Sequence, residues 1–138
     1  MKRFFSLIVV FVLVFTLCAC KSEQKEVDLW ENAMYTTDTV LGEGEKTVTV
    51  SVTADSTTVS FTIHSDEKYL GKALLFHELI TGEEGEYGLF IKSVNGIVAD
   101  YDVDKYYWGF YKDGEYMLNG IDTTEFKDGE HYELVRTK

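Results

Sequence analysis

The sequence predicts an α+β fold in which β-hairpins form a mixed or antiparallel sheet packed on a single α-helix. Three observations predict it: segments of alternating apolar and polar residues at 47–53 and 58–64, a helix-like apolar segment at 69–80, and two apolar runs around Asp113-Gly114. The chain has 138 residues, a length that fits one domain. We therefore expect one folded domain with one main helix.

The composition is acidic and rich in aromatic residues. The chain carries 24 Asp and Glu against 13 Lys and Arg, for a formal net charge of −11, and the basic residues do not cluster. Proteins that bind nucleic acids neutralise phosphates with Lys and Arg, so we expect no nucleic-acid partner. Aromatic residues make up 14% of the chain, more than a low-hydrophobicity, highly charged disordered chain contains.

The N-terminus has the pattern of a secretory signal. Lys2 and Arg3 precede an apolar run over 4–17, which is shorter than the roughly 20 residues of a membrane-spanning helix. The run ends in Leu17-Cys18-Ala19-Cys20, which resembles the lipobox of bacterial lipoproteins. This predicts a signal peptide at 1–19, lipidation of Cys20 and a location on the extracytoplasmic face of the cell membrane. The alternative is an ordinary signal peptide with an incidental cysteine.

If the chain is cleaved before Cys20 and Cys20 is lipidated, no free thiol remains in the mature chain, which excludes disulfides, cysteine nucleophiles and thiolate metal sites. Residues 21–45 are polar and show no sustained period, so we expect 20–45 to be a lipidated N-terminus and flexible acidic tether to a domain at 46–138. Trp30 is unusual for a tether. It either docks on the domain or lies at the membrane surface.

The domain begins with a predicted hairpin. Alternate positions in 47–53 are valines, and Val59, Phe61 and Ile63 alternate in 58–64, so each segment has one apolar face. The polar residues 54–57 between them are typical of a turn. The pair is predicted to form two half-buried strands.

One helix follows, over 69–80, after cap-forming and acidic residues at 65–67. Residues 82–88 are Gly and Glu apart from one Tyr, and predict a loop. Residues 89–94 predict a third strand that ends at an Asn95-Gly96 turn. A last strand is expected at 131–135, after a turn at 127–130.

Residues 105–120 carry the strongest hairpin signal. With Asp113-Gly114 as a two-residue turn, Lys112 faces Glu115 and the pairing continues through Tyr111–Tyr116, Phe110–Met117 and Trp108–Asn119. The pleat then places Trp108, Phe110, Met117 and Asn119 on one face and Tyr107, Tyr111, Tyr116 and Leu118 on the other. One helix covers one face only, so either the hairpin is sandwiched or one face is exposed and binds something.

Several short motifs occur in a recognisable order: Ser93-Val94-Asn95-Gly96-Ile97, Tyr107-Trp108-Gly109-Phe110-Tyr111, Asn119-Gly120-Ile121-Asp122 and Asp128-Gly129-Glu130. Over about residues 46–136 the chain resembles the domain of unknown function 4430 and the C-terminal β-domain of transcobalamin and intrinsic factor. The resemblance implies a β-grasp-like fold and an apolar contact with one side of cobalamin, made here by Phe110 and Met117. The carriers hold most of the ligand with a large helical domain that this sequence lacks, which implies weaker binding.

Catalytic and metal motifs do not fit. The sequence has neither Gly-x-Ser-x-Gly nor His-Glu-x-x-His, and we expect neither an enzyme nor a metal or cofactor site. His77 is interpreted as a core histidine, with ligation of a corrinoid cobalt as the alternative. Asp100, Asp102 and Asp104 match the start of a calcium loop, but Lys105 and Tyr111 occupy positions that need Gly and Glu, which leaves weak surface calcium binding or a solvated acidic loop.

The sequence thus supports a lipid-anchored module that binds cobalamin or another corrinoid-like soluble ligand, for a membrane importer. Its expected ligand-binding residues are Trp108, Phe110, Met117 and Asn119. The competing hypothesis is a protein-interaction module in which the same face docks a second surface protein or an envelope polymer. A third is a structural domain with both hairpin faces buried.

Overall fold

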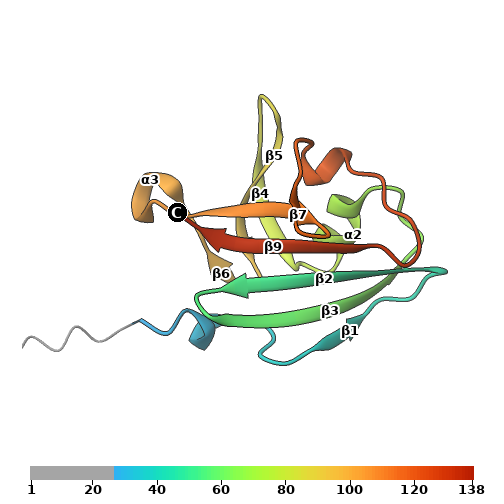
Figure 1. The fold of residues 1–138 in the computed structure, drawn as a ribbon, viewed down its shortest axis with the longest axis horizontal. Helices are drawn as coiled ribbons and strands as arrows, with labels where there is room; N and C mark the ends of the chain where they lie inside the picture. The colour runs from blue at the N-terminus through green and yellow to red at the C-terminus, as the bar shows by residue number, and fades with distance from the viewer. Residues whose placement is uncertain (1–26) are drawn as a thin grey trace, which may run out of the picture.

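The computed structural model describes residues 27–138, which form two β-sheets and one main helix (Figure 1). The α+β prediction is confirmed, with a second sheet that the sequence did not predict. The six-stranded sheet has the order β1 (Thr39–Leu41), β3 (Thr57–Ser65), β2 (Lys46–Ala54), β9 (His131–Thr137), β7 (Tyr107–Lys112) and β8 (Glu115–Tyr116). The three-stranded sheet has the order β4 (Ile80–Gly85), β5 (Gly88–Val94) and β6 (Ile97–Val98). The helical elements are α2 (Leu70–Phe76), α3 (Tyr101–Asp104) and the 3-10 turns η1 (Leu29–Asn32) and η2 (Ile121–Thr123).

The alternating segments form the centre of the large sheet, as predicted. β2 and β3 pair in antiparallel register from Lys46↔Ser65 to Ala54↔Thr57. β2 also pairs in parallel with β9, and β9 pairs antiparallel with β7, so the sheet is mixed. Val48, Val50 and Val52 are fully buried, because the alternation places them on the face that α2 and the small sheet cover.

The helix is shorter than the apolar pattern predicts. It ends at Phe76, and Glu78 has a positive φ of 55°, a conformation that cannot continue a right-handed helix. The Leu79 N–H donates to the Leu74 carbonyl across this break. Leu79 and Ile80 are buried, but Ile80 starts β4, so the pattern at the end of 69–80 reflects burial in a strand.

The expected loop at 82–88 is wrong. Residues 80–94 form an antiparallel hairpin of β4 and β5, here called the arm, that projects from the body of the domain (Figure 1). In β4 only Ile80 is buried and the other five residues are exposed. A strand that buries neither face has no apolar alternation, so its sequence carried no strand signal.

The expected tether is also wrong for the part of it that the structure describes. β1 pairs in parallel with β3, and the Tyr35 ring meets Phe61 edge-on at 5.6 Å between centroids. The Trp30 Nε1–H donates to the Ala54 carbonyl at 3.1 Å, so Trp30 docks on the domain. A Cβ at Gly44 would lie 2.5 Å from the Ser65 backbone, so the end of the expected tether is closely packed on the domain. The predicted signal peptide and Cys20 lie outside the described residues.

Within residues 27–138 the helices are all too short to cross a membrane.

Candidate functional site

The β7–β8 hairpin has the predicted turn and the first two predicted pairs. Lys112 pairs with Glu115, Tyr111 pairs with Tyr116, and both turn residues have positive φ, 49° at Asp113 and 83° at Gly114. The Met117 N–H donates to the Phe110 carbonyl at 2.9 Å. Beyond Met117 the chain bends away and β8 ends, so the predicted Trp108–Asn119 pairing is not formed.

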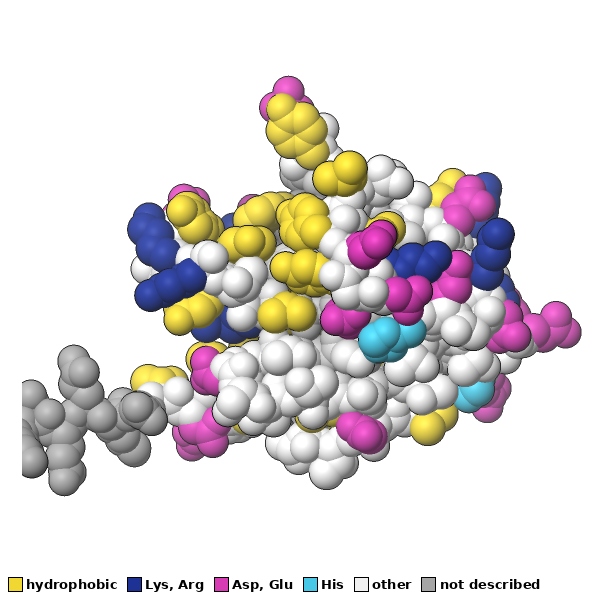
Figure 2. Space-filling view, in the orientation of Figure 1, with side chains coloured by type: hydrophobic (Ala, Val, Ile, Leu, Met, Phe, Trp, Pro, Cys, Tyr) yellow, Lys and Arg dark blue, Asp and Glu magenta, His cyan; other side chains and the backbone are white. Residues whose placement is uncertain are grey.

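The two faces of β7 have different environments. Trp108 and Phe110 point toward the small sheet and are only 6% and 7% exposed, and the Phe110 ring stacks on Tyr132 at 5.6 Å. Tyr111 and Tyr116 lie on the opposite face, where their rings meet edge-on at 5.4 Å. Hydrophobic side chains gather over β7 and the arm in Figure 2, whereas β2 and β3 present a mostly polar surface. The hairpin is therefore not sandwiched.

All four predicted ligand-binding residues line one groove of about 220 Å³ between β5, β7 and residues 116–121, here called the arm groove. Trp108 and Phe110 are its buried members, Met117 is half-buried and Asn119 is exposed. Tyr107, Tyr116 and Leu118, which the pleat assigned to the other face, also line the groove. The other wall comes from Leu89, Phe90 and Ile91, which sequence reasoning did not assign to the site. Their strand was expected over 89–94, but its place beside the hairpin depends on the pairing with β4, which left no alternation in the sequence.

Large apolar side chains are exposed at the mouth of the arm groove. Leu118 is 94% exposed, and Phe90 and Tyr116 are also solvent-accessible. Tyr87, at the turn of the arm, is 91% exposed beside a second, apolar-lined hollow that also includes Leu89 and Phe90. Contiguous exposed apolar side chains of this kind occur at binding sites more often than on the rest of a protein surface.

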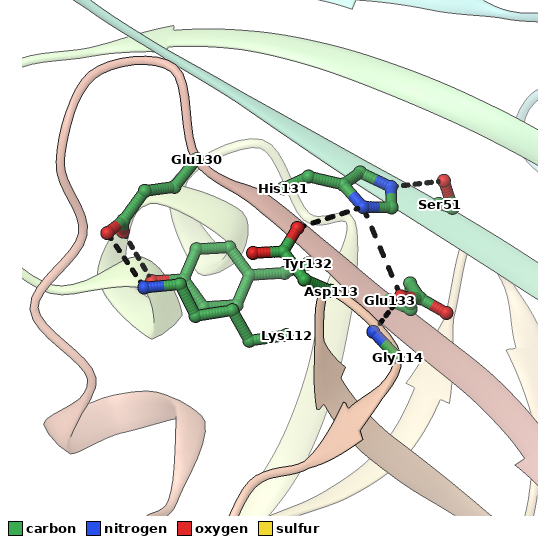
Figure 3. Close-up of polar contacts among 8 residues, drawn as sticks. All are labelled: Ser51, Lys112, Asp113, Gly114, Glu130, His131, Tyr132 and Glu133. Carbon is green, nitrogen blue, oxygen red and sulfur yellow. Dashed lines mark hydrogen bonds and ion pairs between the residues drawn. The ribbon is translucent and has the colours of Figure 1, made fainter.

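Glu130 fixes the strands behind the groove. Its carboxylate accepts hydrogen bonds from Lys112 Nζ at 2.8 Å and Tyr132 Oη at 2.6 Å (Figure 3). It also accepts from the Lys127 backbone N–H at 2.9 Å. Burial opposes ionisation, but these donors outweigh it and lower the pKa of Glu130 to about 2. Burial and the Glu130 charge raise the pKa of Tyr132. The network ties β7 to β9 directly beside Phe110.

A second polar network lies on the outer face. The Ser51 Oγ is 2.9 Å from His131 Nε2, while His131 Nδ1 is 3.9 Å from the Asp113 carboxylate and 4.0 Å from that of Glu133 (Figure 3). The residue types match a hydrolytic triad, but both Nδ1 distances exceed hydrogen-bond range. Glu133 instead accepts from the Gly114 N–H at 2.8 Å, so this network holds the hairpin turn.

The remaining sequence candidates do not join the arm groove. His77 is half-buried at the end of α2, which agrees with the partly buried position expected for it. It lines a separate hollow with His64 and Glu43 and is not part of the arm groove. Asp100 caps α3 through the Asp102 N–H. Across residues 27–138 no three His, Cys, Asp or Glu side chains are placed to hold a metal ion.

Two comparisons place the chain in a family. The family described as "Domain of unknown function (DUF4430)" matches residues 70–132. A crystal structure described as a "putative metal binding protein from Ruminococcus gnavus ATCC 29149" is 40% identical, with a TM-score of 0.65, over 68% of this chain and 98% of that one. The chain belongs to the DUF4430 family. The DUF4430 match contains every residue that lines the arm groove.

The fold of this DUF4430 domain also occurs in a larger protein. A crystal structure of haptocorrin in complex with Cbi is 23% identical, with a TM-score of 0.51, over 71% of this chain. This chain spans 26% of that haptocorrin chain, so the likeness concerns the fold of one part of haptocorrin. No curated protein matches the chain. The two neighbours are consistent with a ligand-binding module.

Proposed function

We propose that this DUF4430 protein is a non-enzymatic module that binds cobalamin or another corrinoid-like soluble ligand in the arm groove. The observation that carries the proposal is that the four residues chosen from the hairpin pleat line one groove, and that large apolar side chains are exposed at its mouth. The four residues are Trp108, Phe110, Met117 and Asn119. The structure of haptocorrin with Cbi supports the ligand class through a shared fold. Direct metal binding has less support, because the described residues form no metal-ligand cluster.

The proposal includes a location. Lipidation of Cys20 would hold the module on the extracytoplasmic face of the cell membrane, where it would capture ligand for a membrane importer. The support is the sequence pattern at residues 17–20. The first element of the described chain, η1, starts at Leu29 and already packs on the core of the domain. The folded domain therefore begins only a few residues after the sequence pattern at residues 17–20.

Calorimetric titration of the full-length chain in detergent with cobalamin tests the proposal. We expect saturable binding with a dissociation constant near micromolar, equivalent to about −8 kcal/mol. No heat of binding up to millimolar cobalamin would contradict it.

The variant for this test is Met117→Ala combined with Leu118→Ser. Both side chains line the groove, yet Leu118 is exposed and Met117 is half-buried, so the fold should tolerate the changes. We expect affinity to fall roughly tenfold or more, the factor for about 1.4 kcal/mol of lost contact. The matched control is Val103→Ser on α3, an exposed apolar residue outside the groove. Equal losses in variant and control would contradict the site.

A second candidate function is docking of another surface protein. It is favoured by Tyr87 and Leu118, which are almost fully exposed at the arm and beside it. A docked partner that stays bound when cobalamin is saturating would support this function. Release of the partner by cobalamin would instead assign the surface to the ligand.

A further inference from the structure

Two buried polar side-chain atoms in the described residues have no hydrogen-bond partner, Trp108 Nε1 and Asp122 Oδ1. The first is a donor and the second an acceptor. An unpaired buried polar group destabilises the folded state, so native structures contain few of them. Trp30 provides the contrast, because its Nε1–H is paired with the Ala54 carbonyl.

Both atoms belong to the surroundings of the arm groove. Trp108 lines the groove directly. The Asp122 Oδ1 lies 2.6 Å from the position of a Cβ at Gly120 and 2.8 Å from that of a Cβ at Gly88. Gly120 is a groove residue, and Gly88 is the arm residue next to Leu89. The unpaired acceptor of Asp122 therefore lies between Gly88 of the arm and Gly120, at the border of the arm groove. Trp108, which carries the unpaired donor, lines the same groove.

On the basis of the proposed function, we infer that the arm groove recognises a primary carboxamide on an apolar ligand. The amide carbonyl would accept from Trp108 Nε1–H, and the amide NH₂ would donate to Asp122 Oδ1. A carboxylate offers no donor and is repelled by Asp122, and an ester offers an acceptor without a donor. A primary carboxamide satisfies both atoms with two separate atoms, its oxygen and its nitrogen, whereas a hydroxyl group must make both hydrogen bonds through one oxygen.

Neither atom is accessible to solvent in this structure. A ligand amide therefore reaches them only when the arm separates from residues 117–120. The arm suits this movement because five of the six residues of β4 are exposed, so few core contacts hold it.

Nuclear magnetic resonance of the full-length chain in detergent, labelled with ¹⁵N at tryptophan, tests the inference. The chain has two tryptophans and hence two indole N–H signals, which Trp30→Phe assigns. The probes are benzamide, methyl benzoate and benzoate, which share a ring and differ in the group that Trp108 and Asp122 would bind. We expect benzamide to shift the Trp108 indole signal in a saturable way, with the Trp30 signal unchanged. Methyl benzoate should bind at least roughly tenfold more weakly, and benzoate should not bind.

The matched variant is Asp122→Leu, which keeps a side chain of similar size and removes both acceptor oxygens. We expect it to lose most of the preference for benzamide over methyl benzoate, while the Trp30 signal reports an intact fold. The inference is overturned if benzamide leaves the Trp108 signal unmoved up to its solubility limit, or if Asp122→Leu keeps the full preference. These probes contain no corrinoid, so a failure of cobalamin to bind would remove the proposed ligand and leave this result to stand separately.

Discussion

At the scale of single residues, Asn95 joins the N-terminal segment to the small sheet. It is fully buried, and its side chain accepts from the Tyr35 N–H at 2.9 Å and donates to the Tyr35 carbonyl at 2.8 Å. Its φ of 52° lies in the left-handed region, which asparagine tolerates better than most residues. The backbone of Asn95 also bonds to Met34 and Leu79. The Asn95 side chain thus supplies the hydrogen bonds at this buried turn and holds residues 33–35 in place.

We expect Asn95→Ala to lower the free energy of unfolding by about 2–4 kcal/mol, because it removes two hydrogen bonds and puts alanine at a positive φ. Urea denaturation measures the change. Asn119→Ala is the matched control, since Asn119 is exposed and its loss should change stability by less than about 0.5 kcal/mol. A similar effect of both substitutions would remove the role assigned to Asn95.

Glu130 makes stability depend on pH in a defined window. Its pKa is about 2 in the folded chain against an ordinary value of 4.5. A lowered folded pKa stabilises the protein fully above pH 4.5, and this contribution is lost as pH falls toward 2. We expect Glu130→Gln to cost on the order of 1–2 kcal/mol at neutral pH after solvent screening, and to flatten the stability profile between pH 4.5 and 2. Denaturation curves across that window test this, with the exposed Glu115→Gln as control. If the unfolding free energy of Glu130→Gln still changed with pH as in the unsubstituted protein, the lowered pKa assigned to Glu130 would be contradicted.

At the scale of elements, the arm and the centre of the large sheet differ in how they are supported. β2 is bonded on both sides, to β3 and β9, and its valines are buried. β4 is bonded on one side, to β5, and five of its six residues are exposed. Elements with few buried contacts open at low free energy, so the arm is the part of the groove that can adjust to a ligand.

Hydrogen exchange checks this difference. We expect the amides at 82–85 to exchange at least about a hundredfold faster than those at 48–52 in the free protein. Cobalamin should slow exchange in the arm, because a ligand in the groove contacts Leu89, Phe90 and Ile91. Arm amides as protected as those of β2 in the free protein would contradict a movable arm.

The elements that sequence reasoning predicted are those with one buried face. β2 and β3 alternate over nine residues each and were placed almost to the residue, and Asp113-Gly114 gave the turn and register of β7 and β8. In the arm, β5 was expected as a strand over 89–94, but β4 was missed because five of its six residues are exposed. The segment at 28–41 was missed because it is held by scattered contacts, from Trp30 to Ala54 and from Tyr35 to Asn95, that have no period along the chain.

At the scale of the whole molecule, the large sheet, α2 and the small sheet enclose one core, and the arm groove opens where β7 of the large sheet meets β5 of the small one. The pleat of one hairpin predicted four of the twelve residues that line this groove. The facing wall comes from residues 89–91, which the sequence separates from the hairpin and only the fold brings near. The sequence did not indicate a role for Asp122 either, because that role rests on a buried oxygen atom without a hydrogen-bond partner.

The most direct test of the central claim is a residue-by-residue chemical-shift map of the full-length chain in detergent, titrated with cobalamin. We predict saturable shifts centred on residues 89–91, 107–110 and 116–121, with the outer-face residues of β2 and β3 unaffected. The claim would be contradicted by a spectrum that does not change at millimolar cobalamin, or by shifts centred on another hollow, such as that between His64 and His77.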